Sequence, residues 1–286
     1  MSHGPALTLL LLLAQAWLPA QTPAGSQGLP PSGNKPGSGV MVTPTRLVIS
    51  HRQRTGEVVL LNPGDVAGTF RVSLTRMEMD DNGACREVRL ERVAEQLNLQ
   101  DLVRFSPKLV TLQPKEAQVV RIQVRRPADL PPGEYRLHMV FREEPPLAPE
   151  AAPGAKPEEA KGLKVQITSV FGVAIPLIIR QGETSATAAL VNLALDPERR
   201  HLSLRLERRG NQSLHGNFQV RFKPLKGPEQ LVGEANGLSV FTPNAFRNVV
   251  LPLKGGDPGP GRFTVTFALP AAQGGARLAE AALDSQ

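Results

Sequence analysis

The sequence has one cysteine and few aromatic residues, and both shortages exclude classes of protein. Cys85 is the only cysteine among 286 residues, so no disulfide forms within the chain and the fold depends on its hydrophobic core. We interpret Cys85 as a partly exposed thiol without a role, with pairing between two chains as the alternative. Trp17 and Tyr135 are the only aromatic residues besides ten phenylalanines, which argues against aromatic platforms that bind single-stranded nucleic acid.

The sequence also lacks the motifs of common enzymes and metal sites. Its five histidines stand at 3, 51, 138, 201 and 215, and no two share the spacing of metal ligands on one helix or strand. No nucleophile elbow, phosphate-binding loop or dinucleotide motif occurs. Asp80 and Asp81 stand in a turn-forming stretch with Asn82 and Gly83, where such residues bond their own backbone. We therefore predict a protein that is not an enzyme and uses no metal or cofactor.

Basic residues outnumber acidic ones, giving a formal net charge of +7. No block of five or more like charges occurs, so the charge is spread over the surface rather than gathered into a binding stripe. Because no nucleic-acid-reading motif accompanies it, we expect no nucleic-acid partner.

The N-terminus has the layout of a secretory signal. Leu7–Leu13 is nearly all leucine, and Ala14, Ala16 and Ala20 follow. This apolar stretch is shorter than the ~20 residues that span a bilayer, and small residues after it mark a cleavage site. We predict a signal peptide at 1–20, cut after Ala16 or Ala20, with no membrane insertion afterwards; an uncleaved anchor helix is the alternative. The Gly-, Pro- and Ser-rich stretch 21–39 is expected to be a flexible leader.

Short strand patterns separated by turn residues fill the rest of the chain. Gly and Pro number 26 and 27, which favours many turns and an all-β fold. His201–Arg208 shows strict alternation, with leucines at 202, 204 and 206. Such strands at roughly 8–12-residue spacing predict β-sandwiches, one over 40–181 and a second over 182–286. Further expectations are a single strand at Val42–Ile49, a helical turn or loop at 97–105, a long bent strand at Leu163–Arg180, and strand or helix at 276–283.

Three groups of residues occur in a recognisable order in the first half. An early strand, Val42–Ile49, carries Arg46. Phe105-Ser106-Pro107 is followed by Leu112-Gln113-Pro114 and Gln118–Arg121. Pro132–Phe141 then leads through a Pro-rich loop to a strand that ends at Ile175–Arg180. In this order the sequence resembles the PapD-like periplasmic chaperones of pilus assembly, well over about Val40–Arg180 and only by architecture beyond it.

The resemblance implies two immunoglobulin-like β-sandwiches at an angle, with a cleft between them. It also implies a periplasmic chaperone that binds exported pilus (fimbrial) subunits, completes their sheet with a strand of its own and delivers them to an outer-membrane usher for pilus biogenesis and cell wall organization. The alternative is a structural or adhesive surface module built from the same sandwiches without chaperone activity.

The resemblance places the donated strand at Leu163–Val173. One face of that strand carries Leu163, Val165, Ile167, Ser169 and Phe171, and its apolar side chains would fill the groove of a subunit. The alternative is that this row fills the core of its own domain.

The family also holds the carboxylate at the end of the subunit with two basic residues. Arg46 matches the first of them, and a guanidinium suits a carboxylate because it donates two parallel hydrogen bonds. The second position is Pro176 here, which has neither charge nor N–H. The resemblance therefore leaves three options: Arg180 or Arg136 substitutes, or Arg46 acts alone. It leaves open the identity of the subunit and the oligomeric state.

Overall fold

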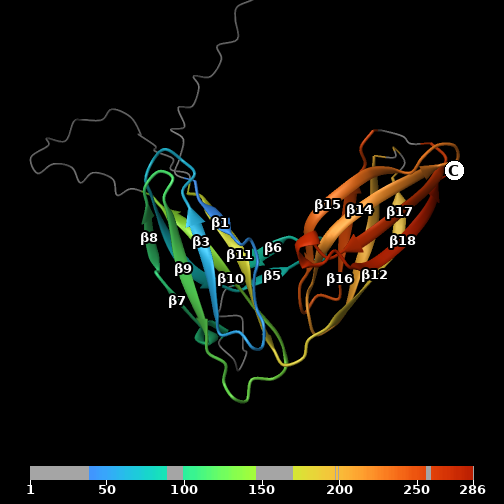
Figure 1. The fold of residues 1–286 in the computed structure, drawn as a ribbon. Coiled ribbons are helices and arrows are strands. Elements are labelled where there is room, and N and C mark those ends of the chain that lie inside the picture. The colour runs from blue at the N-terminus through green and yellow to red at the C-terminus, as the bar shows by residue number, and fades with distance from the viewer. Residues whose placement is uncertain are drawn as a thin grey trace, which may run out of the picture. The chain divides into compact units, whose positions relative to one another are not determined.

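Strands make up nearly all of the regular structure of the protein (Figure 1). The computed structural model describes residues 39–88, 99–145, 170–196, 198, 200–255 and 259–285, which all belong to one compact unit. Two short 3-10 helices interrupt the strands, and none of the helices in these ranges is long and apolar enough to cross a membrane. The predicted all-β class with two β-sandwiches is confirmed. The predicted signal peptide and all of the leader except Gly39 lie outside the described residues.

The first sandwich consists of two sheets and a small hairpin. Strands β1-β3-β9-β7 form one sheet and strands β2-β11-β10-β4-β8 the other, with β5 and β6 paired separately. The bounds are β1 Met41–Thr43, β2 Leu47–Ile49, β3 Thr55–Leu61, β4 Gly68–Thr75, β5 Met77–Met79, β6 Cys85–Glu87, η2 Leu99–Leu102, β7 Val103–Ser106, β8 Leu109–Leu112, β9 Ala117–Val124, β10 Gly133–Glu144 and β11 Gly172–Gln181.

The second sandwich pairs a three-stranded sheet with a four-stranded one. Their orders are β12-β13-β16 and β15-β14-β17-β18. The bounds are β12 Ala186–Leu195, β13 His201–Gly210, β14 Leu214–Pro224, β15 Gln230–Val240, β16 Phe246–Pro252, β17 Gly261–Ala268, η3 Ala271–Gln273 and β18 Arg277–Ser285.

Alternating side chains fill the two cores as the sequence pattern predicts. Phe70 and Val72 of β4 are buried in the first core, and Leu202, Leu204 and Leu206 of β13 in the second. Each buried side chain of this size stabilises the fold by about 1.5–3 kcal/mol. Packing of this kind takes the place of the disulfides that the chain cannot form.

Val42–Ile49 is two strands rather than the single one expected. β1 pairs with β3 in one sheet, and β2 pairs in parallel with β11 in the other. Pro44 lies between them, and its missing N–H cannot continue a ladder. The chain therefore changes sheets here, and this change brings Arg46 beside β11. Gln230–Val240 differs in the opposite sense, because it is one strand whose pairing with β14 is interrupted by two register shifts.

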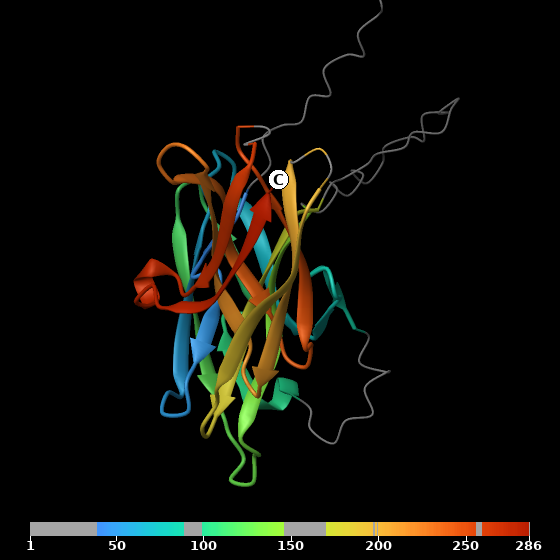
Figure 2. The ribbon, with the colours of Figure 1, turned by 90° about the vertical axis from the view of Figure 1, so that its right-hand side faces the viewer.

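The β5–β6 hairpin of the first sandwich contacts the edge of the second (Figures 1 and 2). Its turn is the Asp-Asp-Asn-Gly stretch that the sequence marks as a turn. Asn248 of β16 donates its backbone N–H to the Asp81 carbonyl at 2.7 Å, and Asn244 Nδ2 donates to the Met79 carbonyl at 2.9 Å. Met79 itself is buried in the second core.

Candidate functional site

The first part of the candidate site is the edge of strand β11. β11 pairs with β10 from Gly172 to Gln181, and the Phe171 carbonyl extends this ladder by accepting from the Glu143 N–H at 2.9 Å. On its other side β11 pairs with β2, over Leu177–Ile179. No strand in the described part of the chain pairs with that side of Gly172–Ile175. Backbone groups at such an edge can bind another strand.

The core-facing side chains of β11 pass from buried to exposed toward its beginning. Ile179, Leu177 and Ile175 are buried in the first core, and Val173 is half-buried against it. Phe171 continues the same face by alternation, yet 62% of its surface is exposed. The core of the first sandwich therefore does not cover Phe171. Val170, which the alternation places on the opposite face, is exposed as well.

The remaining residues of the predicted donor row lie outside the described residues. These are Leu163, Val165, Ile167 and Ser169. Their role as donated side chains stays a prediction.

The second part of the site is the face of β2, β11 and β10 that points away from the first core. Val48 and Ile178 on this face pack into the core of the second sandwich. The polar residues of the face come from three adjacent strands and the turn before β2. They are Arg46, Glu134, Arg136, His138 and Arg180.

Arg46 lies beside side chains of the second sandwich. Its Nη2 donates to the Ser213 Oγ at 3.0 Å and its Nη1 to the Ser239 Oγ at 3.5 Å. Burial lowers the pKa of Arg46 to about 10, an effect that Glu134 partly offsets. The guanidinium therefore remains charged at neutral pH, and its hydrogen-bond partners in the described residues are neutral hydroxyls.

Pro176 and Arg180 follow each other along the same face of β11. Pro176 pairs with His138 across the ladder, and Arg180 pairs with Glu134. The Arg180 Nε donates to the Glu134 carboxylate at 3.3 Å. The Ser213 backbone N–H donates to the same carboxylate at 3.2 Å. Of the two predicted substitutes for the missing basic residue, Arg180 is thus already paired with an anion.

Arg136 packs against an aromatic ring from the second sandwich. Its guanidinium carbon lies 4.1 Å from the centre of the Phe241 ring, and that of Arg46 lies 5.6 Å from the same centre. Burial lowers the pKa of Arg136, which Cys85 and Glu134 partly offset. Phe241 is 8% exposed, so it brings two buried cations to one ring, a favourable arrangement for guanidinium groups.

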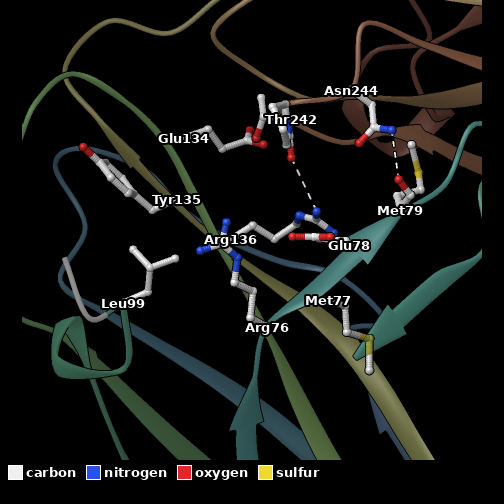
Figure 3. A pocket seen from close by; sticks show the side chains of 11 residues that line it. Arg76, Met77, Glu78, Met79, Leu99, Glu134, Tyr135, Arg136, Thr242 and Asn244 are labelled. Carbon is white, nitrogen blue, oxygen red and sulfur yellow. Dashed lines mark hydrogen bonds between the residues drawn. The ribbon is translucent and has the colours of Figure 1, made fainter. Parts of the chain in front are cut away.

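A pocket of about 670 Å³ opens beside Arg136 (Figure 3). Figure 3 shows Arg136 and Arg76 side by side, with Thr242 and Asn244 of the second sandwich across from them. The Arg136 Nη2 donates to the Thr242 carbonyl at 3.4 Å. The lining residues are Arg76, Met77, Glu78, Met79, Leu99, Glu134, Tyr135, Arg136, Thr242, Pro243 and Asn244.

Two histidines lie near these arginines. His138 is 4% exposed, and its ring meets that of Phe241 edge to face. Burial lowers the pKa of His138 to about 4, and Arg136 acts in the same direction. His215, whose Nδ1 lies 3.0 Å from the Ser239 Oγ, has its pKa lowered to about 4 by burial and by Arg46. Both rings are therefore neutral at pH 7.

The sequence did not identify the second sandwich's share of this site. Phe241 and the serines at 213 and 239 are separated from Arg46 by more than 160 residues and belong to no motif. Glu134 lies within the recognised Pro132–Phe141 group, but its pairing with Arg180 depends on the register of β10 and β11. The alternating polar residues 134, 136 and 138 in an otherwise apolar strand were the one available signal.

Comparison with known proteins gives similarity to solved structures alone. No family model and no curated protein matches the sequence. The YadV chaperone is 13% identical, with a TM-score of 0.44, 86% of this chain covered and 99% of that one. The CupB2 chaperone of Pseudomonas aeruginosa is 14% identical, with a TM-score of 0.43 and coverage of 85% and 98%. A structure of the Salmonella enterica SafA pilin with the SafB chaperone gives 14%, 0.43, 87% and 97%.

These identities and TM-scores state what the chain is similar to and do not define its function. Among the solved structures that it resembles are several chaperones, one of them in complex with a pilin. They include members of the group that the sequence motifs resemble, the PapD-like chaperones of pilus assembly.

Proposed function

We propose that the protein is a periplasmic chaperone that captures exported pilus subunits by lending them the edge of strand β11 and the segment before it. The observation that carries this proposal is the change along the core-facing row of β11. That row is buried at Ile175, half-buried at Val173 and exposed at Phe171.

The proposal follows from what an exposed apolar row beside an open edge requires. Apolar side chains gain about 1.5–3 kcal/mol each when they are buried, and unpaired backbone groups gain hydrogen bonds when a strand is added. A pilus subunit that lacks one strand of its own sheet would supply both partners at once. The predicted donor row, Leu163 to Phe171, continues the line of β11 in the direction in which its own core ends.

The basic face gives the proposal a second contact. Arg46 stays the predicted anchor for the carboxylate at the end of the subunit, since it is a buried cation bound to neutral hydroxyls. The periplasmic location rests on the secretory layout of 1–20, and the usher is a proposed partner by resemblance alone.

Co-expression with a pilus subunit encoded in the same gene cluster tests the function. We expect a soluble one-to-one complex in the periplasm and a longer lifetime of the subunit than in cells without the chaperone. A subunit that is degraded equally fast in both strains, with no complex, would leave the structural or adhesive module as the better description.

A further inference from the structure

The pocket beside Arg136 combines a buried cation with an apolar wall. Its size, about 670 Å³, is within the range of ~300–1,000 Å³ typical of small-molecule sites. Arg76 and Arg136 lie at one side (Figure 3), and Met77, Met79 and Leu99 supply apolar surface. Arg46 does not line it.

The guanidinium of Arg136 has donors to spare. Its Nε and Nη1 are buried without a hydrogen-bond partner, and the bond of Nη2 to the Thr242 carbonyl is long, at 3.4 Å. A buried donor without an acceptor costs about 1–3 kcal/mol. An acceptor that enters the pocket, with a small turn of the side chain, would recover this cost, and a carboxylate offers two oxygens to one guanidinium.

The acidic groups around the pocket leave room for such an anion. Glu134 is buried and its carboxylate is neutralised by Arg180. Glu78 is exposed to solvent, where its charge is screened. The two guanidiniums of Arg76 and Arg136 are close enough for each to disfavour the charge of the other, and a bound carboxylate would relieve that repulsion.

We propose that this pocket binds a carboxylate joined to a short apolar group, with the carboxylate on Arg136 and the apolar group against Met77, Met79 and Leu99. Two sources share this chemistry, namely the last residue of a polypeptide and a free short-chain acid. The site itself does not depend on the proposed chaperone function. A chain end as ligand would connect the two, because Arg136 would then hold the end of a captured subunit.

Titration of the full chain with small probes tests the site without any subunit. We expect N-acetyl-leucine to bind at least ten-fold more tightly than its uncharged amide, as measured by NMR shifts of residues around the pocket. Arg136→Gln should abolish this difference. Arg121→Gln, which removes the same charge from an exposed side chain of β9, should preserve it. Equal binding of acid and amide, or an unchanged difference in Arg136→Gln, would refute the proposal.

A second variant guards against an indirect effect of the arginine change on the fold. Met77→Glu leaves the contacts of Arg136 in place and adds a carboxylate to the wall, so it should weaken N-acetyl-leucine binding at least ten-fold. Unchanged binding would place the ligand elsewhere and overturn the assignment. Hexanoate separates the two sources: tighter binding than N-acetyl-leucine supports a free acid, and weaker binding supports a chain end.

Discussion

Glu134 and Arg180 lie directly opposite each other on β10 and β11, and the Arg180 Nε donates to the Glu134 carboxylate at 3.3 Å. The Glu134 side chain is fully buried, whereas 24% of the Arg180 side chain is exposed. The same carboxylate also favours the charged forms of Arg46 and Arg208. One buried acid thus stabilises several cations where the two sandwiches meet.

Replacement of Glu134 by Gln should therefore destabilise the fold strongly. The substitution keeps the shape but removes the charge that compensates these guanidiniums, and breaking a buried ion pair costs about 3–5 kcal/mol. Urea unfolding measures the loss. The matched control is Glu57→Gln, since Glu57 pairs with Arg121 and both side chains are mostly exposed; we expect less than ~1 kcal/mol there. Similar small losses in both variants would contradict the assigned role of Glu134.

Buried His138 should make the fold less stable as the pH falls. Its pKa in the folded protein is about 4, below the usual 6.5, so between these values the unfolded chain binds the proton more readily. The stability that depends on the neutral ring is complete above pH 6.5 and declines toward pH 4. His215 acts in the same direction.

The difference between wild type and His138→Phe isolates this contribution, because all other groups titrate in both proteins. Between pH 7.5 and 5, the wild type should lose about 2 kcal/mol more unfolding free energy than the variant. Urea unfolding at the two pH values gives both quantities. A variant that loses as much as the wild type would show that His138 is accessible to protons in the folded state.

The sequence predicted the strands well wherever one face alone is buried. His201–Arg208 and Thr69–Met77 alternate because a sandwich strand has one face in the core and one in solvent. Val42–Ile49 was wrong as a single strand because apolar periodicity does not say which sheet a strand joins. Pro44 was visible, and the change of sheets was the missing step.

The candidate site could be predicted from the sequence only on the side of the first sandwich. Arg46 and Arg136 are visible as charged residues in apolar strands. Their meeting at Phe241 is not, because that ring comes from the segment after β15, and packing across distant segments leaves no local pattern. The unpaired edge of β11 is likewise a property of strand order, which depends on the whole topology.

Asn244 fastens the β5–β6 hairpin to the second sandwich, so its loss should loosen the hairpin. Asn244→Ala removes the bond to the Met79 carbonyl, worth about 0.5–1.5 kcal/mol. Limited trypsin digestion should then cut faster at Arg76 and Arg86, which flank and enter the hairpin.

The control for this change lies wholly within the second sandwich. The Asn217 Oδ1 accepts from the Gly237 N–H at 2.9 Å, so Asn217→Ala also loses one side-chain hydrogen bond. Cleavage at Arg76 and Arg86 should stay at the wild-type rate in that variant. If both variants accelerate cleavage equally, the effect is one of general stability and the hairpin is held by other contacts.

Phe171 and Val170 are exposed neighbours on opposite faces of the strand leading into β11, and this makes them a matched pair for the proposed capture of subunits. Phe171→Asp should weaken binding about 10- to 100-fold, since burial of such a ring is worth ~1.5–3 kcal/mol. Val170→Asp should have little effect because its side chain points away from the subunit groove. The affinities follow from a competition binding assay with a co-purified subunit.

The stability of the free protein decides between donation and the alternative that this row fills its own core. Under donation, Phe171→Asp melts at the wild-type temperature, and Ile167→Asp, further along the predicted row, behaves in the same way. Under the core alternative, both variants unfold the free protein at a lower temperature. Full subunit binding by Phe171→Asp would remove the reason to place the captured strand at the edge of β11, because the exposed row and the open backbone would then serve no common partner.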